Sequence, residues 1–202
     1  MTEKSKNTEA NIRYFNRWSH FYNKDPISLW LLWTQRKVLR RIPFKKSDSV
    51  LDIGCGTGSG LRFLSRQGMT NLSGIDLSQE MIRHARQNLP ASIRLKVASV
   101  ESIPFPGNFF DVVINTEAFH HFPEPKTAIS EMARVLKKDG LLCISDINFF
   151  LKPIHLLFEK FEPGCVHIYS KKEFEKLFKE AGLTIIKQQR INLFAILTIA
   201  KK

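Results

Sequence analysis

The chain has 202 residues, of which 43% are hydrophobic and 25% are charged. This length and composition fit one domain with a sizeable core. No apolar run approaches the roughly 20 residues that cross a bilayer, and the N-terminus lacks the apolar segment of a secretory signal. The three cysteines form no CxxC pair and no metal-ligand spacing, so we expect no disulfide framework, no metal site and a cytoplasmic location.

Positive charge is concentrated at the two ends of the chain, which carries a formal net charge of +12. Residues 1–46 contain 11 basic and 3 acidic side chains, residues 47–150 contain 10 and 11, and residues 151–202 contain 10 and 5. Such basic flanks can attract a nucleic acid, an anionic membrane or an acidic substrate, or can simply keep the surface solvated.

From residue 48 onward, short apolar runs alternate with amphipathic stretches, a pattern typical of a doubly wound α/β fold with helices on both faces of a mostly parallel sheet. Only Asn192 separates the last two strands, so we expect them to be antiparallel neighbours. The sequence therefore predicts a seven-stranded sheet with its last strand antiparallel, preceded by an N-terminal helical lid. The expected strands span residues 49–53, 72–75, 93–97, 110–115, 141–147, 183–191 and 193–200, and the expected helices span residues 11–22, 26–42, 59–66, 78–88, 125–136 and 171–181.

The strongest chemical signal is the glycine-rich sequence VLDIGCGTGSG at residues 50–60. A glycine loop between a first strand and a helix allows the backbone to approach a ligand closely. Asp76 ends the second expected strand, 22 positions after Gly54, where a carboxylate can accept both hydroxyls of a ribose. Together the loop and the acid predict an adenosine site at the carboxyl edge of the sheet.

Two features of the loop favour S-adenosylmethionine over NAD as the ligand. A dinucleotide fingerprint has glycine three positions after its second glycine, but Ser59 stands three positions after Gly56. Asp52, just ahead of the loop, would repel a pyrophosphate and could pair with the ammonium of an amino-acid tail.

Several motifs in order, LDIGCGTGSG, GIDLS, FDVVINTEAFHHF and ARVLKKDGLLCIS, resemble those of the class I S-adenosylmethionine-dependent methyltransferases. The similarity covers residues 48–147 and is greatest to the branch that contains the ubiquinone and menaquinone biosynthesis enzymes. It implies a Rossmann-like methyltransferase domain over residues 47–202, with a substrate-side insertion at 148–170. Residues 1–46 then form a helical lid or substrate element.

The resemblance implies S-adenosyl-L-methionine as cofactor and assigns its contacts to the glycine loop and to the ends of three further strands. Many relatives have Asp where this chain has Ser99, which can still hydrogen-bond the adenine, though less strongly than a carboxylate. The expected cofactor-binding residues are Asp52, Gly54, Cys55, Gly56, Gly58, Asp76, Leu77, Met81, Ser99, Val100, Asn115 and Thr116.

A general base is needed only if the acceptor must lose a proton. His120 and His121, just beyond the fourth strand, are the candidate catalytic residues, and Glu117 is a further polar candidate. The alternative for the histidines is that one ring only packs or caps the following segment.

The methyl acceptor should meet the N-terminal helices and the insertion, both rich in aromatic residues. Tyr14, Trp18 and Tyr22 are the candidate substrate-binding residues. They favour a small, hydrophobic or aromatic acceptor and O- or C-methylation, although such stripes also pack helices onto a sheet.

Three other interpretations stay open at this point. The basic flanks suggest an RNA methyltransferase, but the sequence has no separate RNA-binding module and no recognisable base-targeting motif. The departure at Ser99 leaves open a non-enzymatic cofactor-binding subunit. Trp30 and Trp33 precede the basic run 36–46, and such an aromatic and basic helix can lie at a membrane surface. Peripheral membrane contact of this kind is compatible with an enzyme.

Overall fold

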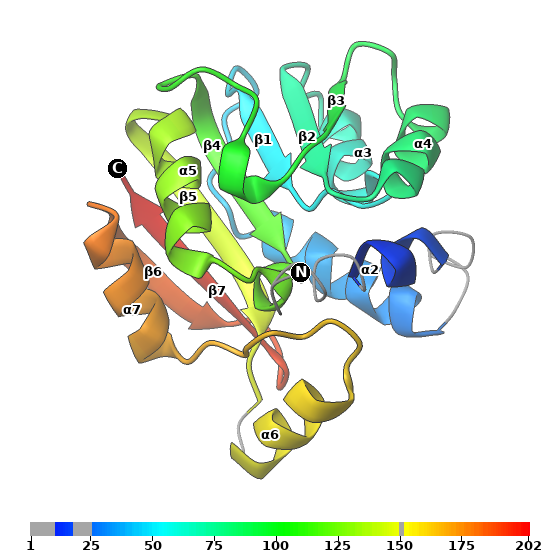
Figure 1. Ribbon diagram of the computed structural model, residues 1–202. Helices are drawn as coiled ribbons and strands as arrows, with labels where there is room; N and C mark the ends of the chain where they lie inside the picture. The colour runs from blue at the N-terminus through cyan, green and yellow to red at the C-terminus, as the bar shows by residue number, and fades with distance from the viewer. Residues whose placement is uncertain (1–10, 18–25, 150–151) are drawn as a thin grey trace.

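A computed structural model describes residues 11–17, 26–149 and 152–202 of the chain. It contains a seven-stranded sheet in the order β3-β2-β1-β4-β5-β7-β6 (Figure 1). The strands are β1 (Val50–Ile53), β2 (Leu72–Asp76), β3 (Arg94–Val97), β4 (Phe110–Thr116), β5 (Leu136–Ile147), β6 (Thr184–Arg190) and β7 (Ala195–Lys201). The helices are a segment at 11–17, α2 (Pro26–Leu39), α3 (Ser59–Arg66), α4 (Gln79–Asn88), α5 (Pro125–Val135), α6 (Lys152–Phe161) and α7 (Lys171–Glu180), with short 3₁₀ turns η1 (Val100–Ser102) and η2 (Phe119–His121).

The pairing confirms the predicted fold class. Strands β1 to β5 pair in parallel, whereas β7 is antiparallel to both β5 and β6. The reversed strand, β7, lies inside the sheet, between β5 and β6. It runs antiparallel to β6 because a short loop joins the two strands and leaves no room for a crossover.

Helices cover both faces of the sheet and bury two apolar layers. On one face, α5 and α7 contribute Met132, Phe174 and Phe178 to a core that also contains residues of β4 and β5. On the other face, α2, α3 and α4 contribute Leu39, Leu61 and other side chains to a second core. Since the end of α2 is part of this second core, the residues expected to form a separate lid also hold the main domain together.

Helix boundaries follow local capping. The side chain of Ser78 accepts a hydrogen bond from the backbone N–H of Met81 and starts α4 as expected. Ser170 and Glu173 form a capping box that starts α7. Gly182, just past the end of α7, has φ +72°, the left-handed conformation expected of a residue that ends a helix.

Three predicted boundaries were wrong. Helix α2 ends at Leu39 rather than near residue 42, and β5 begins at Leu136 rather than at residue 141. The chain turns at Asp139, which has φ +65°, and the β4–β5 register shifts there, so Leu136 already pairs with Phe110. Residues 193 and 194 belong to the turn before β7, which starts at Ala195.

The insertion after β5 contains α6, a helix that the sequence analysis did not predict. Figure 1 shows α6 projecting beyond the end of the sheet where β5 finishes, and the chain then returns past η2 towards α7. Within the described ranges, no helix is long and apolar enough to cross a membrane.

Candidate functional site

A cavity of about 200 Å³ lies at the carboxyl ends of the central parallel strands. Its wall includes Ile53 at the end of β1, Asp76 at the end of β2 and Thr116 at the end of β4. The chain moves outward from β1 to β2 and β3 and then returns to β4 on the other side of β1, and open α/β sheets bind ligands at such a switch point. Phe15 and Leu31, from the N-terminal helices, complete the wall.

The glycines of the loop after β1 serve different purposes. Gly56 has φ +53°, and a Cβ atom added to it would meet nothing within 4 Å, so its backbone faces open space in the cavity. Gly54, with φ +68°, packs so closely that a Cβ would lie 2.9 Å from Cβ of Ala118. Gly58 does not line the cavity, because a Cβ there would meet Leu89 at 2.5 Å. The structure thus places Gly54 and Gly56, but not Gly58, at the cavity.

Asp76 fixes the loop through both carboxylate oxygens. Oδ2 accepts a hydrogen bond from the backbone N–H of Gly56 and Oδ1 accepts one from the backbone N–H of Ser78, each at 2.8 Å. Burial raises the pKa of Asp76, and the two backbone donors oppose this shift. Each oxygen can accept a further bond, so this carboxylate can also hold a pair of neighbouring hydroxyls.

Asp52 lies fully buried beneath the loop rather than on the cavity wall. Neither of its carboxylate oxygens has a hydrogen-bond partner among the described residues. Burial, together with the charge of Asp76, raises the pKa of Asp52 to about 8. A buried carboxylate without partners is costly, and an ammonium group placed above the loop would relieve that cost. This residue therefore fits an amino-acid tail.

Most of the other expected cofactor-binding residues line the cavity. Ser99 starts η1 by accepting a hydrogen bond from the backbone N–H of Glu101 at 3.2 Å, and its hydroxyl hydrogen can make a second bond. Asn115 is fully buried and donates to the carbonyl oxygen of Ile53 at 2.8 Å, so it joins β4 to β1 instead of facing the cavity. Those that the structure brings to the wall are Cys55, Leu77, Met81, Ser99, Val100 and Thr116.

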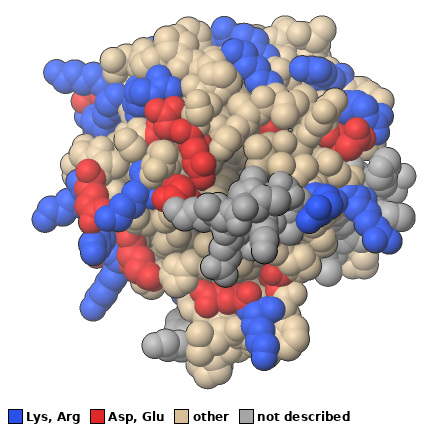
Figure 2. Space-filling view, viewed as in Figure 1, with Lys and Arg blue, Asp and Glu red and all other residues tan. Residues whose placement is uncertain are grey.

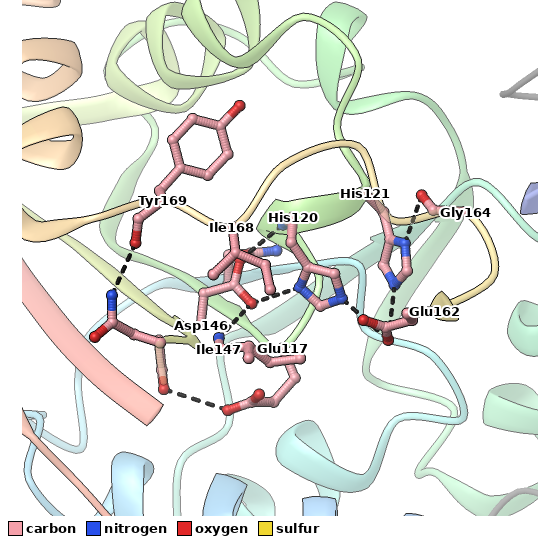
Figure 3. Close-up of polar contacts among 12 residues, drawn as sticks. Glu117, His120, His121, Asp146, Ile147, Glu162, Gly164, Ile168 and Tyr169 are labelled. Atoms are coloured by element: carbon pink, nitrogen blue, oxygen red, sulfur yellow. Dashed lines mark hydrogen bonds and ion pairs between the residues drawn. The ribbon is translucent and has the colours of Figure 1, made fainter. Parts of the chain in front are cut away.

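His120 is held between two carboxylates (Figure 3). Its Nδ1 lies 2.6 Å from Oδ1 of Asp146, and its backbone N–H donates to Oδ2 of the same residue at 2.7 Å. Its Nε2 lies 3.4 Å from Oε1 of Glu162. Burial by itself would lower the pKa of His120, but Asp146 and Glu162 raise it to about 10. The two carboxylates therefore favour the protonated form of the His120 ring.

His121 has the opposite electrostatic environment. Its Nδ1 lies 2.9 Å from the carbonyl oxygen of Gly164 and must donate there, which leaves Nε2 directed towards Glu162 at 4.0 Å. Burial and the neighbouring charge of His120 lower the pKa of His121 well below 6.5. The ring is thus neutral, and it contacts the edge of Phe15 at a centroid distance of 5.0 Å.

Glu117 also lines the cavity, and its backbone has φ +54°, a left-handed conformation that is uncommon outside glycine. Its Oε2 is buried and has no hydrogen-bond partner within the part of the chain that the structure describes. Burial and the charge of Asp146 raise the pKa of Glu117 to about 8. An unusual backbone conformation and a carboxyl that titrates near neutrality are both features of functional sites.

Of the three expected substrate-binding residues, the structure describes only Tyr14. Tyr14 is 36% exposed and is not on the cavity wall, because the segment 11–17 turns Ile12 and Phe15 inward instead. Tyr14 therefore lies on a different face of this helix from the residues that line the cavity. Trp18 and Tyr22 lie outside the described residues, as does Asp25.

Sequence reasoning missed three polar residues of the site. Gln35, on α2, donates from Nε2 to Oγ1 of Thr116 at 2.8 Å and so joins the N-terminal helix to the end of β4. Asp146 is the last residue but one of β5, at the same edge as Asp76, a position that could have drawn attention to it. Glu162 lies just after α6, and no sequence pattern connected it to the histidines.

Comparison with known proteins gives the family. Residues 51–144 match the family model described as a methyltransferase domain. The chain is 32% identical over 118 residues to the 2-methyl-6-phytyl-1,4-hydroquinone methyltransferase of Synechocystis sp., covering 52% of this chain and 37% of that protein. It is 30% identical over 151 residues to a ubiquinone biosynthesis O-methyltransferase of Neisseria meningitidis, covering 67% and 63%. This chain thus spans less than two-thirds of either relative.

The fold has close counterparts among solved structures. A chain from the complex between the Trm112 methyltransferase activator of Haloferax volcanii and a methyltransferase superposes with a TM-score of 0.81, at 24% identity, covering 93% of this chain and 96% of that one. The family match over residues 51–144 and the methyltransferase relatives identify a class I methyltransferase domain in this chain, of the kind whose cofactor is S-adenosylmethionine.

Proposed function

We propose that this protein transfers a methyl group from S-adenosylmethionine to a small, hydrophobic or aromatic acceptor, by O- or C-methylation. The observation that carries the proposal is that one cavity includes both Asp76 and Glu117 in its wall. Phe15, Leu31 and Phe122 add apolar surface to the same cavity. Two relatives are a hydroquinone methyltransferase and an O-methyltransferase of ubiquinone biosynthesis, which makes a phenolic oxygen the first acceptor class to test.

The adenosine half of the cavity is assigned from the hydrogen-bonding groups on its wall. Asp76 holds the ribose hydroxyls, Ser99 contacts the adenine, and Leu77, Met81 and Val100 enclose the base. When bound, the cofactor supplies an electrophilic methyl group on a sulfonium.

The amino-acid tail lies along the glycine loop in this proposal. Gly54, Cys55 and Gly56 provide the backbone surface, and Asp52 balances the ammonium charge from beneath. Gly58 and Asn115 act indirectly, because they shape the loop and the strand ends without facing the cavity.

The acceptor half of the cavity, whose wall contains Glu117, His120 and His121, holds the groups that could remove a proton from the acceptor. His120 is paired with Asp146, which favours its protonated form and makes it a poor proton acceptor. His121 is a weak base, because its pKa is held low. Glu117 has an unpartnered oxygen and a pKa of about 8, near the value that suits a general base at working pH. We assign proton removal to Glu117 and contact with the acceptor oxygen to the histidine pair.

A protein that acts on RNA would need a continuous basic surface around the cavity. Among the residues drawn in colour, Figure 2 shows Lys and Arg side chains mainly towards the edge of this view, with Asp and Glu among them, rather than gathered in one patch. The observation favours a small acceptor over a nucleic acid on this face. The unpartnered oxygen of Glu117 likewise favours an enzyme over a subunit that only binds the cofactor.

The test is a methyl-transfer assay with S-adenosylmethionine and separate pools of phenols, hydroquinones and total RNA, with products identified by mass spectrometry. We expect methylated phenol or hydroquinone, and a loss of product in Glu117→Gln but not in Glu175→Gln, a matched change on the exposed surface of α7. Methyl transfer to RNA alone would contradict the acceptor class. Tight cofactor binding without turnover on any pool would support the non-enzymatic alternative.

A further inference from the structure

We propose that His120, His121 and Glu162 form a binding site for a divalent transition-metal ion of the zinc type in the acceptor half of the cavity. The inference rests on the proposed function and deepens it, because the ion would bind the acceptor oxygen. Each of the three residues offers one ligand atom, and these atoms all lie within 4.8 Å of one another. All three residues line the cavity.

The distances between the ligand atoms are close to those of a real site. Zinc binds histidine nitrogen at about 2.0–2.1 Å and carboxylate oxygen at about 2.0–2.2 Å, so tetrahedral ligand atoms lie about 3.4 Å apart. Nε2 of His120 lies 3.4 Å from Oε1 of Glu162, and Nε2 of His121 lies 4.0 Å from the same oxygen. All three ligand atoms lie within 4.8 Å of one another, so they would draw closer together to surround an ion.

The groups behind the two histidines orient them as metal ligands. Asp146 lies 2.6 Å from Nδ1 of His120, and the carbonyl oxygen of Gly164 lies 2.9 Å from Nδ1 of His121. In both rings Nε2 is left to face Glu162 (Figure 3). A carboxylate or a backbone carbonyl on the far nitrogen is the usual arrangement around a metal-ligating histidine, because it fixes the ring and raises its basicity.

The local charge also favours a cation. Asp146, Glu162 and Glu117 bring three carboxyl groups to this end of the cavity, and Oε2 of both glutamates is buried without a hydrogen-bond partner among the residues described. A divalent ion would offset part of this negative charge and would also satisfy the carboxylate of Glu162.

Another histidine near the site, His167 between α6 and α7, differs from the two proposed ligands in the partners of its ring nitrogens. Nδ1 of His167 lies 2.9 Å from Glu159, and its Nε2 lies 2.8 Å from Glu173. Both ring nitrogens are thus used by carboxylates, one half-buried and one exposed, and His167 is not on the cavity wall. His167 resembles the proposed ligands in residue type and neighbourhood but has no nitrogen left for an ion, which makes it the matched control.

Three protein ligands leave one position of a tetrahedral ion for the acceptor. An acceptor oxygen bound there loses its proton more readily, since the positive ion stabilises the anion. Glu117 takes the proton, a lone pair of the oxygen bonds to the methyl carbon, and the carbon–sulfur bond breaks with its electron pair left on sulfur. The acceptors that suit such a site are phenols, whose single oxygen fits the one open position.

The test measures metal binding directly. The full chain, freed of metals by a chelator, is titrated with Co²⁺ for its visible absorption and with Zn²⁺ for heat. We expect one ion per chain with micromolar affinity or tighter. His121→Ala and Glu162→Gln should weaken binding about 100-fold or more, Asp146→Asn about 10–100-fold, and His167→Ala should leave it unchanged.

Two controls separate the possible failures. Each variant is also titrated with S-adenosylhomocysteine, and unchanged affinity shows that the variant is folded and that the cofactor half is intact. A wild-type chain that binds S-adenosylhomocysteine but neither ion would overturn the metal site and leave the proposed function standing. Equal loss of ion binding in His167→Ala and His121→Ala would also overturn it.

Discussion

The carboxylate of Asp76 accepts a hydrogen bond from the backbone N–H of Gly56 at 2.8 Å, across the gap between the first two strands. This bond holds the glycine loop open in the conformation in which Gly56 has φ +53°. The residue assigned to the ribose therefore also shapes the loop assigned to the amino-acid tail, and a change at Asp76 should affect both parts of the cofactor.

The open face of Gly56 gives the first prediction. Gly56 and Gly182 both have positive φ, and an added Cβ would meet nothing within 4 Å at either position. An alanine should cost about 1–2 kcal/mol of unfolding free energy at both sites, because the left-handed conformation is strained for L-residues. Only Gly56→Ala should also weaken S-adenosylhomocysteine, by about tenfold or more, as its methyl group enters the ligand space.

Urea unfolding measures the first effect and isothermal titration the second. Gly182→Ala serves as the control for strain alone, since Gly182 follows α7 and is not on the cavity wall. Equal affinity of the two variants for S-adenosylhomocysteine would mean that the ligand does not pass over Gly56.

Asp52 gives a prediction about pH. The folded protein keeps a proton on Asp52 up to a pKa of about 8, whereas the unfolded chain loses it near the ordinary value of 3.8. Between these values the folded state binds more protons, so this group makes the ligand-free protein less stable as pH rises. Asp52→Asn should therefore be more stable than wild type at pH 7 and about equal to it at pH 4. A wild-type advantage at pH 7 in urea unfolding would contradict this account of Asp52.

The same variant tests the assignment of the amino-acid tail. Asp52→Asn should weaken S-adenosylhomocysteine about 10–100-fold, because a charge-assisted interaction with the ammonium is lost. Methylthioadenosine has the same nucleoside without the amino-acid tail, and its affinity should not change. If both ligands weaken equally in calorimetry, Asp52 supports the loop rather than the ammonium.

Glu117→Gln should lower kcat for a phenolic acceptor by about 10²–10⁴-fold while cofactor affinity stays unchanged. In metal-free wild type the rate should rise with pH until Glu117 is ionised, near its pKa of about 8, because a base acts in its deprotonated form. Asp146, His120 and Glu162 are the charged groups that set this value. A more acidic phenol, already ionised at the assay pH, should recover part of the lost rate; no recovery would argue against proton removal by Glu117.

The sheet, its reversed strand and the meeting of the glycine loop with Asp76 at one edge were predictable because their signals are local. The glycine loop lies between one strand and one helix, and Asp76 ends the very next strand, so parallel pairing alone brings them to the same edge. Asn192 likewise allowed the reversed strand to be predicted, since a loop that short permits only an antiparallel return.

The acceptor half was less predictable because its parts come from distant segments. Glu162 reaches His120 across 42 residues, through a helix, α6, that the sequence analysis did not anticipate. Gln35 reaches Thr116 across 81 residues. Tyr14 and Phe15 are neighbours with similar side chains, and only the rotation of their helix on the sheet decides that Phe15 faces the cavity. Such contacts depend on tertiary packing, which residue spacing does not encode.

The most direct test of the central claim is isothermal titration of S-adenosylhomocysteine and, separately, NAD into wild type and Asp76→Ala. We predict micromolar binding of S-adenosylhomocysteine to wild type, a loss of about 100-fold or more in Asp76→Ala, and no binding of NAD to either. Binding of NAD, or equal affinity of wild type and Asp76→Ala for S-adenosylhomocysteine, would contradict the assignment of this cavity to the methyl donor.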